Sequence, residues 1–493
     1  MKHFKLITFI GLLLLCFHST ANADIQIKVN KPYLNIPVSH KVDRNIMTIS
    51  VNGKTDKSFV IRLATDTPDY WVFADMTPYI GKTITLAYAG NAAGLAKISQ
   101  SDKIVGSDSL YKEINRPQLH YTAQRGWNND PNGLIYYEGE YHLFINTTPM
   151  NAIGRTCIGG HAVSTDLLHW KELPEALYPD ANGTAFSGTC VIDYDNTSGF
   201  GTKAKPAMVV LYTAFTQEKQ VQCLAYSIDK GRTWSKYKAN PIIDSKAKWN
   251  SNDTRDPKVF WYKPTNKWVM VLNERDGHSI YNSTNSKDWT FESHITGFWE
   301  CPELFELAID GNKAHTLWVM YGASGTYMLG NFDGRKFTPV SGKHTYCNGR
   351  IYAAQTFANM PDTDGRRIQI GWGHIDHKGM PFQGQLNLPT ELSLRTTPDG
   401  VRMFNNPIKE IDQLQQTVKQ LVSTTSLTAE QANQLLQTYN NAGTLRIKTT
   451  FKLSHATGAG LNLFGQRIID YDLNHNQLNK AILFTCRSNQ YGT

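Results

Sequence analysis

The stretch Lys258-Val259-Phe260-Trp261-Tyr262, with the polar turn 263–267 and the run Trp268-Val269-Met270-Val271-Leu272 after it, decides the fold. Two short runs rich in β-branched and aromatic residues on either side of a polar turn predict an antiparallel hairpin. The same arrangement recurs four times in the middle of the chain, at 133–144, 190–212, 303–320 and 352–372. This part of the sequence therefore predicts a set of five similar β-units.

A second repeat follows four of these hairpins. Residues 164–170, 227–234 and 283–289 each begin with Ser and are closed by Trp, and 331–337 is a weaker copy closed by Phe. We expect the Asp or Asn of each repeat to hydrogen-bond its own turn and the aromatic ring to pack between units. Four-stranded units at such a period are typical of propeller blades. The prediction is a five-bladed β-propeller over residues 113–407.

The regions on either side of the propeller have other patterns. Short alternating runs in 24–112, separated by turn signals such as Asn52-Gly53, predict a small β-sandwich without a catalytic constellation, and so an accessory domain. In 408–493 we expect a linker with near-helical spacing of apolar residues, then a capping box at Thr428–Gln431 that opens a short helix. Strands resume at 445–453, the start of a second β-sandwich that is expected to be incomplete. The fold class predicted is all-β.

Composition excludes several classes of protein. Apolar residues make up 41% and charged residues 19%, which is ordinary for a globular protein and excludes disorder and coiled coil. The net charge of +8 is scattered along the chain, so no nucleic-acid partner is expected. The mature chain has no membrane-spanning apolar run. Its six cysteines form no CxxC pair, so neither structural zinc nor any other metal or cofactor is expected.

The first 23 residues have the pattern of a secretory signal peptide. A basic start and an apolar core precede the small-residue site Ala21-Asn22-Ala23, which predicts a secreted or periplasmic protein. Cys16 raises a cell-surface lipoprotein as the second choice, because Leu15 is large where a lipid-attachment site requires a small residue.

An acidic residue stands just before the innermost strand of three predicted blades. The three stretches are Asn129-Asp130-Pro131, Arg255-Asp256-Pro257 and Glu300-Cys301-Pro302. Innermost strands surround the propeller axis, so these positions direct three carboxylates into one central funnel. Like charges in a confined site raise each other's pKa, and two carboxylates with separated pKa values are the groups that glycoside hydrolysis requires. For any single acid, the alternative is a turn-capping Asp before Pro.

These motifs resemble those of glycoside hydrolase family 32, the invertase, inulinase and levanase group. The resemblance rests on 127–133 (Trp-Asn-Asn-Asp-Pro-Asn-Gly), on the Arg255 and Glu300 motifs in that order, and on Ala185-Phe186-Ser187-Gly188 and Gly371-Trp372. It extends over about 117–411 and implies a five-bladed propeller followed by a β-sandwich. The N-terminal sandwich resembles an extra module of Bacteroidetes members.

The resemblance also implies an activity: hydrolysis, with retention, of β-fructofuranosidic bonds in levan or inulin, with sucrose as a further candidate. Asp130 would be the nucleophile, Glu300 the general acid/base and Asp256 the stabiliser of the transition state. Residues that would contact the fructosyl unit are Asn129, Ser187 and Arg255. We expect Arg255 to keep Asp256 ionised, and crowding by the other two acids to keep Glu300 protonated. Candidate apolar walls for the sugar are Trp127, Phe186, Trp299 and Trp372; blade packing is the alternative for Trp127 and Trp372.

Two positions depart from the family pattern. Asn146, counted among the substrate-binding residues, stands where the family usually has the longer Gln, and Gly159-Gly160-His161 lacks the usual Trp before Gly-His. The departures concern substrate choice more than chemistry. Two other functions stay open, a non-catalytic carbohydrate-binding propeller and a fructosyltransferase. The sialidase suggested by 227–234 lacks support, because that repeat is structural.

Overall fold

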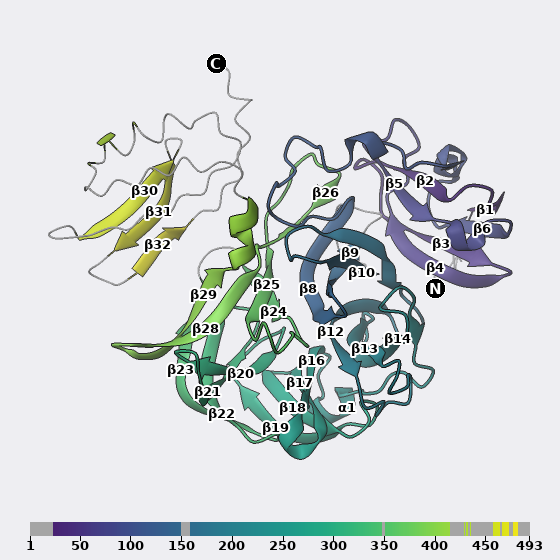
Figure 1. Ribbon diagram of the computed structural model, residues 1–493. Helices are drawn as coiled ribbons and strands as arrows, with labels where there is room; N and C mark the ends of the chain where they lie inside the picture. Colours follow the sequence, from purple (N-terminus) through teal and green to yellow (C-terminus); the bar gives the residue numbers. More distant parts are fainter. Residues whose placement is uncertain are drawn as a thin grey trace, which may run out of the picture. The chain divides into compact units, whose positions relative to one another are not determined.

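The computed structural model describes residues 23–148, 158–347 and 351–414, together with short stretches between 428 and 481. Almost all of the predicted signal peptide and the predicted strand at 445–453 lie outside these residues. The chain divides into two compact units, one ending at Val105 and one beginning at Gly106. The described elements are overwhelmingly strands, as the all-β prediction requires (Figure 1). None of the helices found among the described residues is long and apolar enough to cross a membrane.

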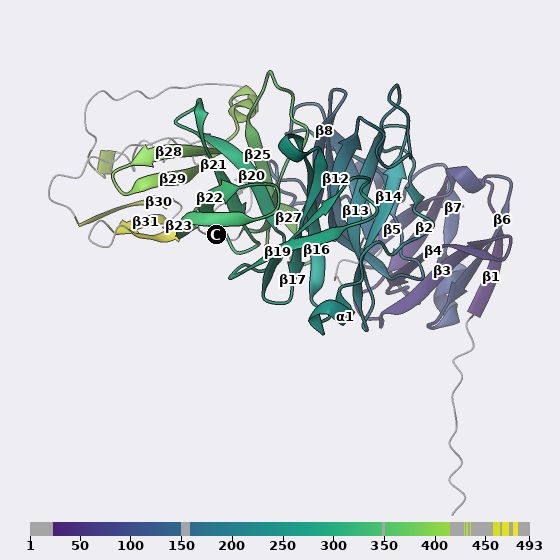
Figure 2. The same cartoon turned by 90° about the horizontal axis from the view of Figure 1, so that it is seen from below.

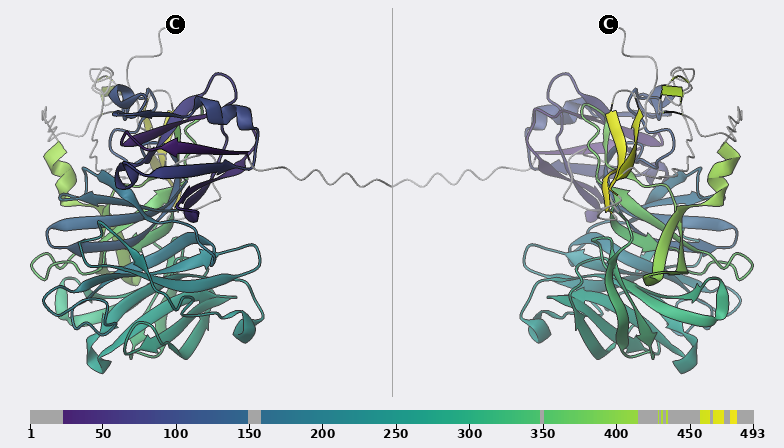
Figure 3. Two further views of the ribbon diagram at one scale, coloured as in Figure 1. Left: turned by 90° about the vertical axis from the view of Figure 1, so that its right-hand side faces the viewer. Right: turned by 90° about the vertical axis from the view of Figure 1, so that its left-hand side faces the viewer.

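The smaller unit has two antiparallel sheets, drawn in purple and blue in Figure 3. One has the order β1 (Ala23–Lys28), β6 (Thr83–Tyr88), β3 (Asn45–Val51), β4 (Lys54–Ile61). It contains the alternating runs that predict strands at 25–29, 47–51, 59–63 and 83–88. The other has the order β5 (Tyr70–Asp75), β2 (Tyr33–Val38), β7 (Ser99–Ser101), which the sequence analysis missed. Strand β2 is buried from Leu34 to Val38, so it lacks the alternation that marks a half-exposed strand.

The larger unit is built from successive antiparallel sheets. The five predicted hairpins are all present, and their first strands are β8, β12, β16, β20 and β24. The first three sheets contain β8 (Gly126–Tyr137), β9 (Glu140–Thr148), β10 (Ile158–Ser164) and β11 (Lys171–Leu177), then β12 (Thr184–Asp193), β13 (Ala207–Phe215), β14 (Gln220–Ser227) and β15 (Ser235–Lys236), then β16 (Thr254–Tyr262), β17 (Lys267–Glu274), β18 (Gly277–Ser283) and β19 (Thr290–Thr296).

The strands from β20 to β29, apart from β26, form one continuous sheet. It joins β20 (Glu303–Ile309), β21 (Asn312–Tyr321), β22 (Thr326–Phe332) and β23 (Phe337–Thr345) to β24 (Tyr352–Thr356), β25 (Arg367–Gly373), β27 (Gln385–Leu386), β28 (Thr390–Thr397) and β29 (Gly400–Pro407). Strand β26 (Phe382–Gln383) instead pairs with β8.

The first strands of successive sheets lie side by side. Strand β8 contacts both β12 and β24, and β12 contacts β16, so the end of the unit returns to its beginning (Figures 1 and 2). Apolar side chains fill the spaces between neighbouring sheets, in clusters that draw residues from both. Consequently the residues at the start of β8, β12, β16 and β24 face a common centre.

The Trp-closed repeats form the outer turns. Asp166 Oδ1 accepts the backbone N–H groups of Leu168 and His169 at 2.9 and 2.8 Å, as predicted. The Trp170 indole N–H is donated to the carbonyl of Leu167, and the repeats closed by Trp234 and Trp289 have the same bond. Trp234 also packs edge-on against Phe144 of the preceding sheet, which confirms that the ring lies between units.

After the larger sheets, the described residues include the predicted capping box. The N–H of Thr428 is donated to Gln431 Oε1 at 2.9 Å and the N–H of Gln431 to Thr428 Oγ1 at 3.2 Å. Further on, β30 (Gly458–Leu463), β31 (Gln466–Asp472) and β32 (Gln477–Ala481) form a three-stranded antiparallel sheet.

Candidate active site

A β-bulge interrupts the first strand of four sheets at equivalent positions. The register breaks between Asn128 and Pro131 in β8, Ala185 and Gly188 in β12, Arg255 and Lys258 in β16, and Tyr352 and Gln355 in β24. A bulge frees residues from the ladder and redirects their side chains. The residues so freed include five predicted site residues: Asn129, Asp130, Phe186, Ser187 and Asp256.

The three predicted carboxylates lie close enough to affect one another. The pKa of Asp130 is raised well above its ordinary value, first by burial and then by the charges of Asp256 and Glu300, against a smaller opposing effect of Arg255. Oδ1 of Asp130 is buried without a hydrogen-bond partner. The structure therefore brings Asp130, Asp256 and Glu300 into one polar cluster.

Arg255 is the cationic member of this cluster. Its guanidinium donates to Glu300 Oε1 from Nη2 at 2.8 Å and from Nε at 3.1 Å, and to Asp253 Oδ1 at 2.9 Å. Oδ2 of Asp256 lies farther away, 4.0 Å from Nε. Burial raises the pKa of Asp256 to about 6 although Arg255 and the N–H of Cys301 both oppose the rise. Arg255 thus favours the ionised form of Asp256, as expected, while its direct hydrogen bonds go to Glu300 and Asp253.

Glu300 stands in the loop before β20, and its carboxylate has two partners. Oε1 accepts from Arg255, and Oε2 accepts the hydroxyl proton of Tyr352. The sequence analysis missed Tyr352, although it begins the fifth innermost strand, just before the bulge in β24. Its place at the start of a predicted blade could have identified it, because the same comparison of blade starts identified Asp130 and Asp256.

The predicted sugar-contacting residues differ in burial and in whether their polar atoms already have hydrogen-bond partners. Ser187 and Asn146 are almost fully buried, at 1% and 4% exposure, and Nδ2 of Asn146 donates to Ser187 Oγ at 2.8 Å. Asn129 Oδ1 is buried without a partner. Phe186 stacks on Phe215 with ring centroids 4.6 Å apart, and Trp127 packs edge-on against Trp372 at 6.2 Å.

Two further features concern the departures from the family pattern. A Cβ atom on Gly159 would lie 3.1 Å from Cβ of Leu177, and one on Gly160 would lie 2.6 Å from Cγ2 of Thr147. The space beside these glycines is therefore occupied by strands β9 and β11. Trp299, by contrast, is 42% exposed, and the Arg255 guanidinium lies 5.1 Å from its ring centroid.

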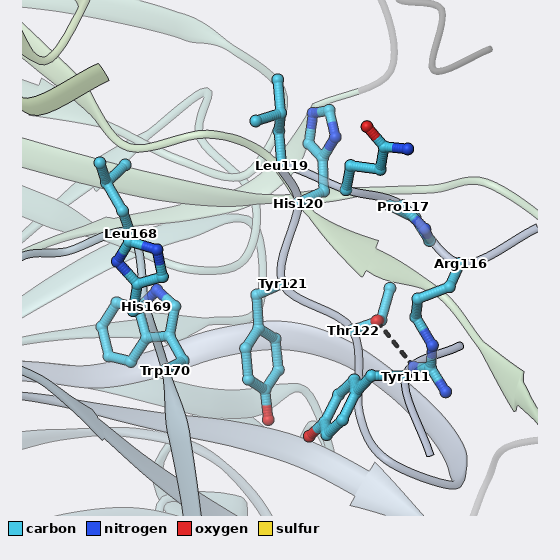
Figure 4. Close-up of a pocket in the computed structure, with 11 residues that line it drawn as sticks. Tyr111, Arg116, Pro117, Leu119, His120, Tyr121, Thr122, Leu168, His169 and Trp170 are labelled. Carbon is cyan, nitrogen blue, oxygen red and sulfur yellow. Dashed lines mark hydrogen bonds between the residues drawn. The ribbon is translucent and has the colours of Figure 1, made fainter. Parts of the chain in front are cut away.

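A separate cavity of about 430 Å³ lies in the larger unit, lined by Tyr111 and by residues 116–122 and 168–170 (Figure 4). None of the predicted site residues lines it. The Arg116 guanidinium is held by Glu113, Thr122 and two backbone carbonyls, and the Trp170 indole by Leu167. No group of three His, Cys, Asp or Glu side chains that could hold a metal ion occurs within the described part of the chain.

Comparison with known proteins places these observations in a family. The profile of the glycosyl hydrolases family 32 N-terminal domain matches residues 120–407. A levanase from Bacillus subtilis is 39% identical over 402 residues, 76% of this chain and 57% of the levanase. Invertase 1 of Saccharomyces cerevisiae is 32% identical, with 76% of both chains covered. The crystal structure of an exo-inulinase from Aspergillus awamori superposes with a TM-score of 0.55 at 32% identity, covering 60% of this chain and 68% of the inulinase.

Two of the matched relatives, both levanases, are much longer than this chain. The chain spans 57% of the Bacillus subtilis levanase and 42% of a second levanase, from Bacillus sp.. It therefore spans about half the length of these two relatives.

Proposed function

We propose that this chain, which belongs to glycosyl hydrolase family 32, hydrolyses β-fructofuranosidic bonds in fructans, with levan or inulin as polymer and sucrose as a small substrate. The similarity to levanases, an exo-inulinase and an invertase supports this substrate class. The observation that carries the proposal is the cluster of Asp130, Asp256 and Glu300 beside the Arg255 guanidinium. Equivalent strand bulges free Asp130 and Asp256, and the loop before β20 supplies Glu300.

In this proposal the five hairpins of the larger unit are the inner strands of the five blades of a propeller, which forms the catalytic domain over residues 113–407. Residues 24–112 are an accessory β-sandwich, and 408–493 are a linker with the start of a second sandwich. Residues 1–23 are a signal peptide, so the enzyme is secreted or periplasmic. A related inulinase from Aspergillus niger is described as extracellular, which supports the last point.

The reaction would proceed by double displacement. The carboxylate of Asp130 attacks C2 of the fructosyl unit, the bond from C2 to the leaving oxygen breaks, and Glu300 gives its proton to that oxygen. Water then attacks C2 of the fructosyl ester, gives a proton to Glu300 and releases fructose and the free Asp130 carboxylate. Two displacements at the same carbon preserve the anomeric configuration.

The charge imbalance of the cluster suits the transition state of this reaction. A glycosyl group departs with oxocarbenium character, so positive charge develops on the ring. Three carboxylates share one guanidinium in the free protein, and burial together with the like charges raises the pKa of Asp130. A developing positive charge among them supplies the missing counter-charge, which strengthens binding in the transition state more than in the ground state.

The remaining predicted residues would form the sugar site around these acids. Asn129 has a free side-chain oxygen to accept a sugar hydroxyl, and Asp256 with Arg255 holds further hydroxyl groups. Asn146 supports Ser187 from behind, since the two are hydrogen-bonded to each other. The aromatic walls are Trp127, Phe186 and Trp372.

Incubation with levan, inulin and sucrose, followed by product chromatography, tests the proposal. We expect release of fructose or short fructans by the wild-type protein and none by Asp130→Asn prepared in the same way. NMR of the first-formed product should show the β-anomer. Fructosyl transfer products in place of hydrolysis would indicate a fructosyltransferase, and binding of all three sugars without any product would indicate a carbohydrate-binding propeller.

A further inference from the structure

The backbone that carries Glu300 has an unusual conformation. Glu300 and Cys301 have φ angles of +52° and +42°, two consecutive left-handed residues that both bear a Cβ atom. This conformation is unfavourable for such residues, and it persists only where neighbouring groups impose it. The position of the Glu300 carboxyl therefore depends on whatever holds this short loop.

Three neighbouring elements hold the loop. The N–H of Ala323 is shared between the carbonyls of Trp299 and Glu300, at 3.0 and 3.1 Å. The N–H of Cys301 is donated to Asp256 Oδ2 at 3.0 Å. The N–H of Glu300 itself is donated to the side-chain oxygen of Asn273 at 2.9 Å. Asn273 belongs to β17, in the sheet that also carries Arg255 and Asp256.

Only the oxygen of the Asn273 side-chain amide has a hydrogen-bond partner. Asn273 is fully buried, and its Nδ2 group has no hydrogen-bond partner. The residue opposite it on β18 is His278, which is also fully buried. An amide kept only to stabilise the sheet would bond through both ends, because a buried donor without a partner is unfavourable. The one bond that the Asn273 side chain makes is directed to Glu300.

We infer that Asn273 is a positioning residue for Glu300, an inference that rests on the proposed function of Glu300 as general acid/base. The Asn273 carbonyl fixes the N–H of Glu300 and hence the peptide plane before it. The Glu300 side chain is thereby directed to the place where Arg255 and Tyr352 donate hydrogen bonds to its two carboxylate oxygens. Loss of the Asn273 acceptor lets the loop relax and moves the carboxyl away from the leaving oxygen.

Substitution of Asn273 by Leu removes the acceptor at similar volume. We expect kcat on sucrose and inulin oligosaccharides to fall by about 10²-fold with little change in KM, the scale of a misplaced catalytic group. β-D-Fructofuranosyl fluoride needs no proton on its leaving group, so kcat/KM for the fluoride should fall far less. Asn273→Asp retains an oxygen acceptor and should recover most of the activity on sucrose.

Asn282→Leu is the matched control. Asn282 is buried on neighbouring β18, and its Nδ2 donates to the carbonyl of Gly334, away from Glu300. This variant should lose stability without any leaving-group dependence. If Asn273→Leu does not fold, Asn273→Ala adds no bulk and has the same expected result.

Two results overturn the inference: equal loss of kcat/KM on the fluoride and on sucrose, or loss in Asn273→Asp as large as in Asn273→Leu. A wild-type protein inactive on the fluoride and on all fructans contradicts the proposed function instead.

Discussion

Two clusters of buried charge lie two or three residues apart on the same segments, and they are built in opposite ways. On β16, Asp256 belongs to the carboxylate cluster, whereas Lys258 forms an ion pair with Glu303, Nζ to Oε1 at 2.7 Å. In the segment around the start of β20, Glu300 likewise belongs to the carboxylate cluster and Glu303 to the ion pair. The pair is almost fully buried, at 5% and 0% side-chain exposure, and Thr356 bonds to both partners.

The difference between the clusters lies in charge balance and in partners. Lys258 and Glu303 form a direct ion pair and both bond to Thr356, and the Arg367 cation also interacts with Glu303, so the buried carboxylate is fully compensated. Around Asp130, three carboxylates share Arg255, and one Asp130 oxygen has no partner. An unbalanced cluster costs stability in the free protein, so its presence indicates binding or catalysis, whereas the balanced pair indicates structure.

The largest effect is expected for substitution of Asp130, which should lower activity strongly without lowering stability. Asp130→Asn should lower kcat by more than about 10⁴-fold, as removal of a nucleophile does. Because the folded-state pKa of Asp130 is raised, its contribution to folding is favourable at low pH and is lost as pH rises through that pKa. The Asn side chain does not titrate, so the variant avoids this loss of stability, and its Tm at pH 7 should equal or exceed that of wild type. Calorimetry at pH 4 and pH 7 checks the sign; a lower Tm at pH 7 would place Asp130 in a balanced structural pair.

Glu300→Gln should have the next largest effect. General acid/base catalysis typically contributes about 10²–10⁴ in rate, and one residue here serves both steps. Substrates with activated leaving groups should lose less in kcat/KM than sucrose does, because their first step needs no proton. A loss of the same size for good and poor leaving groups would show that Glu300 is not the acid.

The balanced pair should respond in the opposite way. Lys258→Met leaves the Glu303 carboxylate buried without its partner, which typically costs about 3–5 kcal/mol in the free energy of unfolding. The folded fraction should keep nearly normal kcat, since neither residue belongs to the proposed catalytic machinery. Urea unfolding with Lys258→Met/Glu303→Gln as the control checks this, because the double variant removes both charges and should recover part of the loss. Unchanged stability in the single variant would mean that the comparison between the clusters is wrong.

The two clusters should also differ in their response to pH. Burial raises the pKa of Asp256 to about 6 and also raises the pKa of Asp130, so the carboxylate cluster takes up protons as the pH falls through this range. We expect kcat/KM to fall about tenfold per pH unit below 6, with an apparent pKa that belongs to the coupled cluster. A pH profile of kcat/KM on sucrose measures it, and Arg255→Met should move the acid limb to higher pH. A profile that stays flat down to pH 4.5 would contradict the assignment.

Sequence reasoning reached the carboxylate cluster because three acids occupy the same place in a repeated unit. The five hairpins and the Trp-closed turns were predictable for the same reason, since their hydrogen bonds are local. Lys258 and Glu303 were counted only as the first residues of strands, because their pairing joins two sheets. Asn273 was missed because it acts on Glu300 across a distance in sequence that no local pattern records. Tyr352 was missed although it stands at the start of a repeated unit, because it is not an acid. In the smaller unit, β2 was missed because burial on both faces removes alternation.

The smallest expected effect concerns the outer part of the sugar site. Asn146 is one methylene shorter than the Gln usual in the family, and the space beside Gly159 is occupied by Leu177. If the site for the first sugar is loosened there, binding energy must come from units farther along the chain, and a truncated substrate cannot use it. We therefore expect kcat/KM to rise severalfold from sucrose to fructan oligosaccharides of increasing length. Trp299 is the candidate platform, being 42% exposed beside Arg255, so Trp299→Ala should flatten the rise while leaving sucrose hydrolysis nearly unchanged. Steady-state kinetics over a chain-length series decides the matter, and a flat or falling kcat/KM in the wild-type protein would show that the two departures have no such consequence.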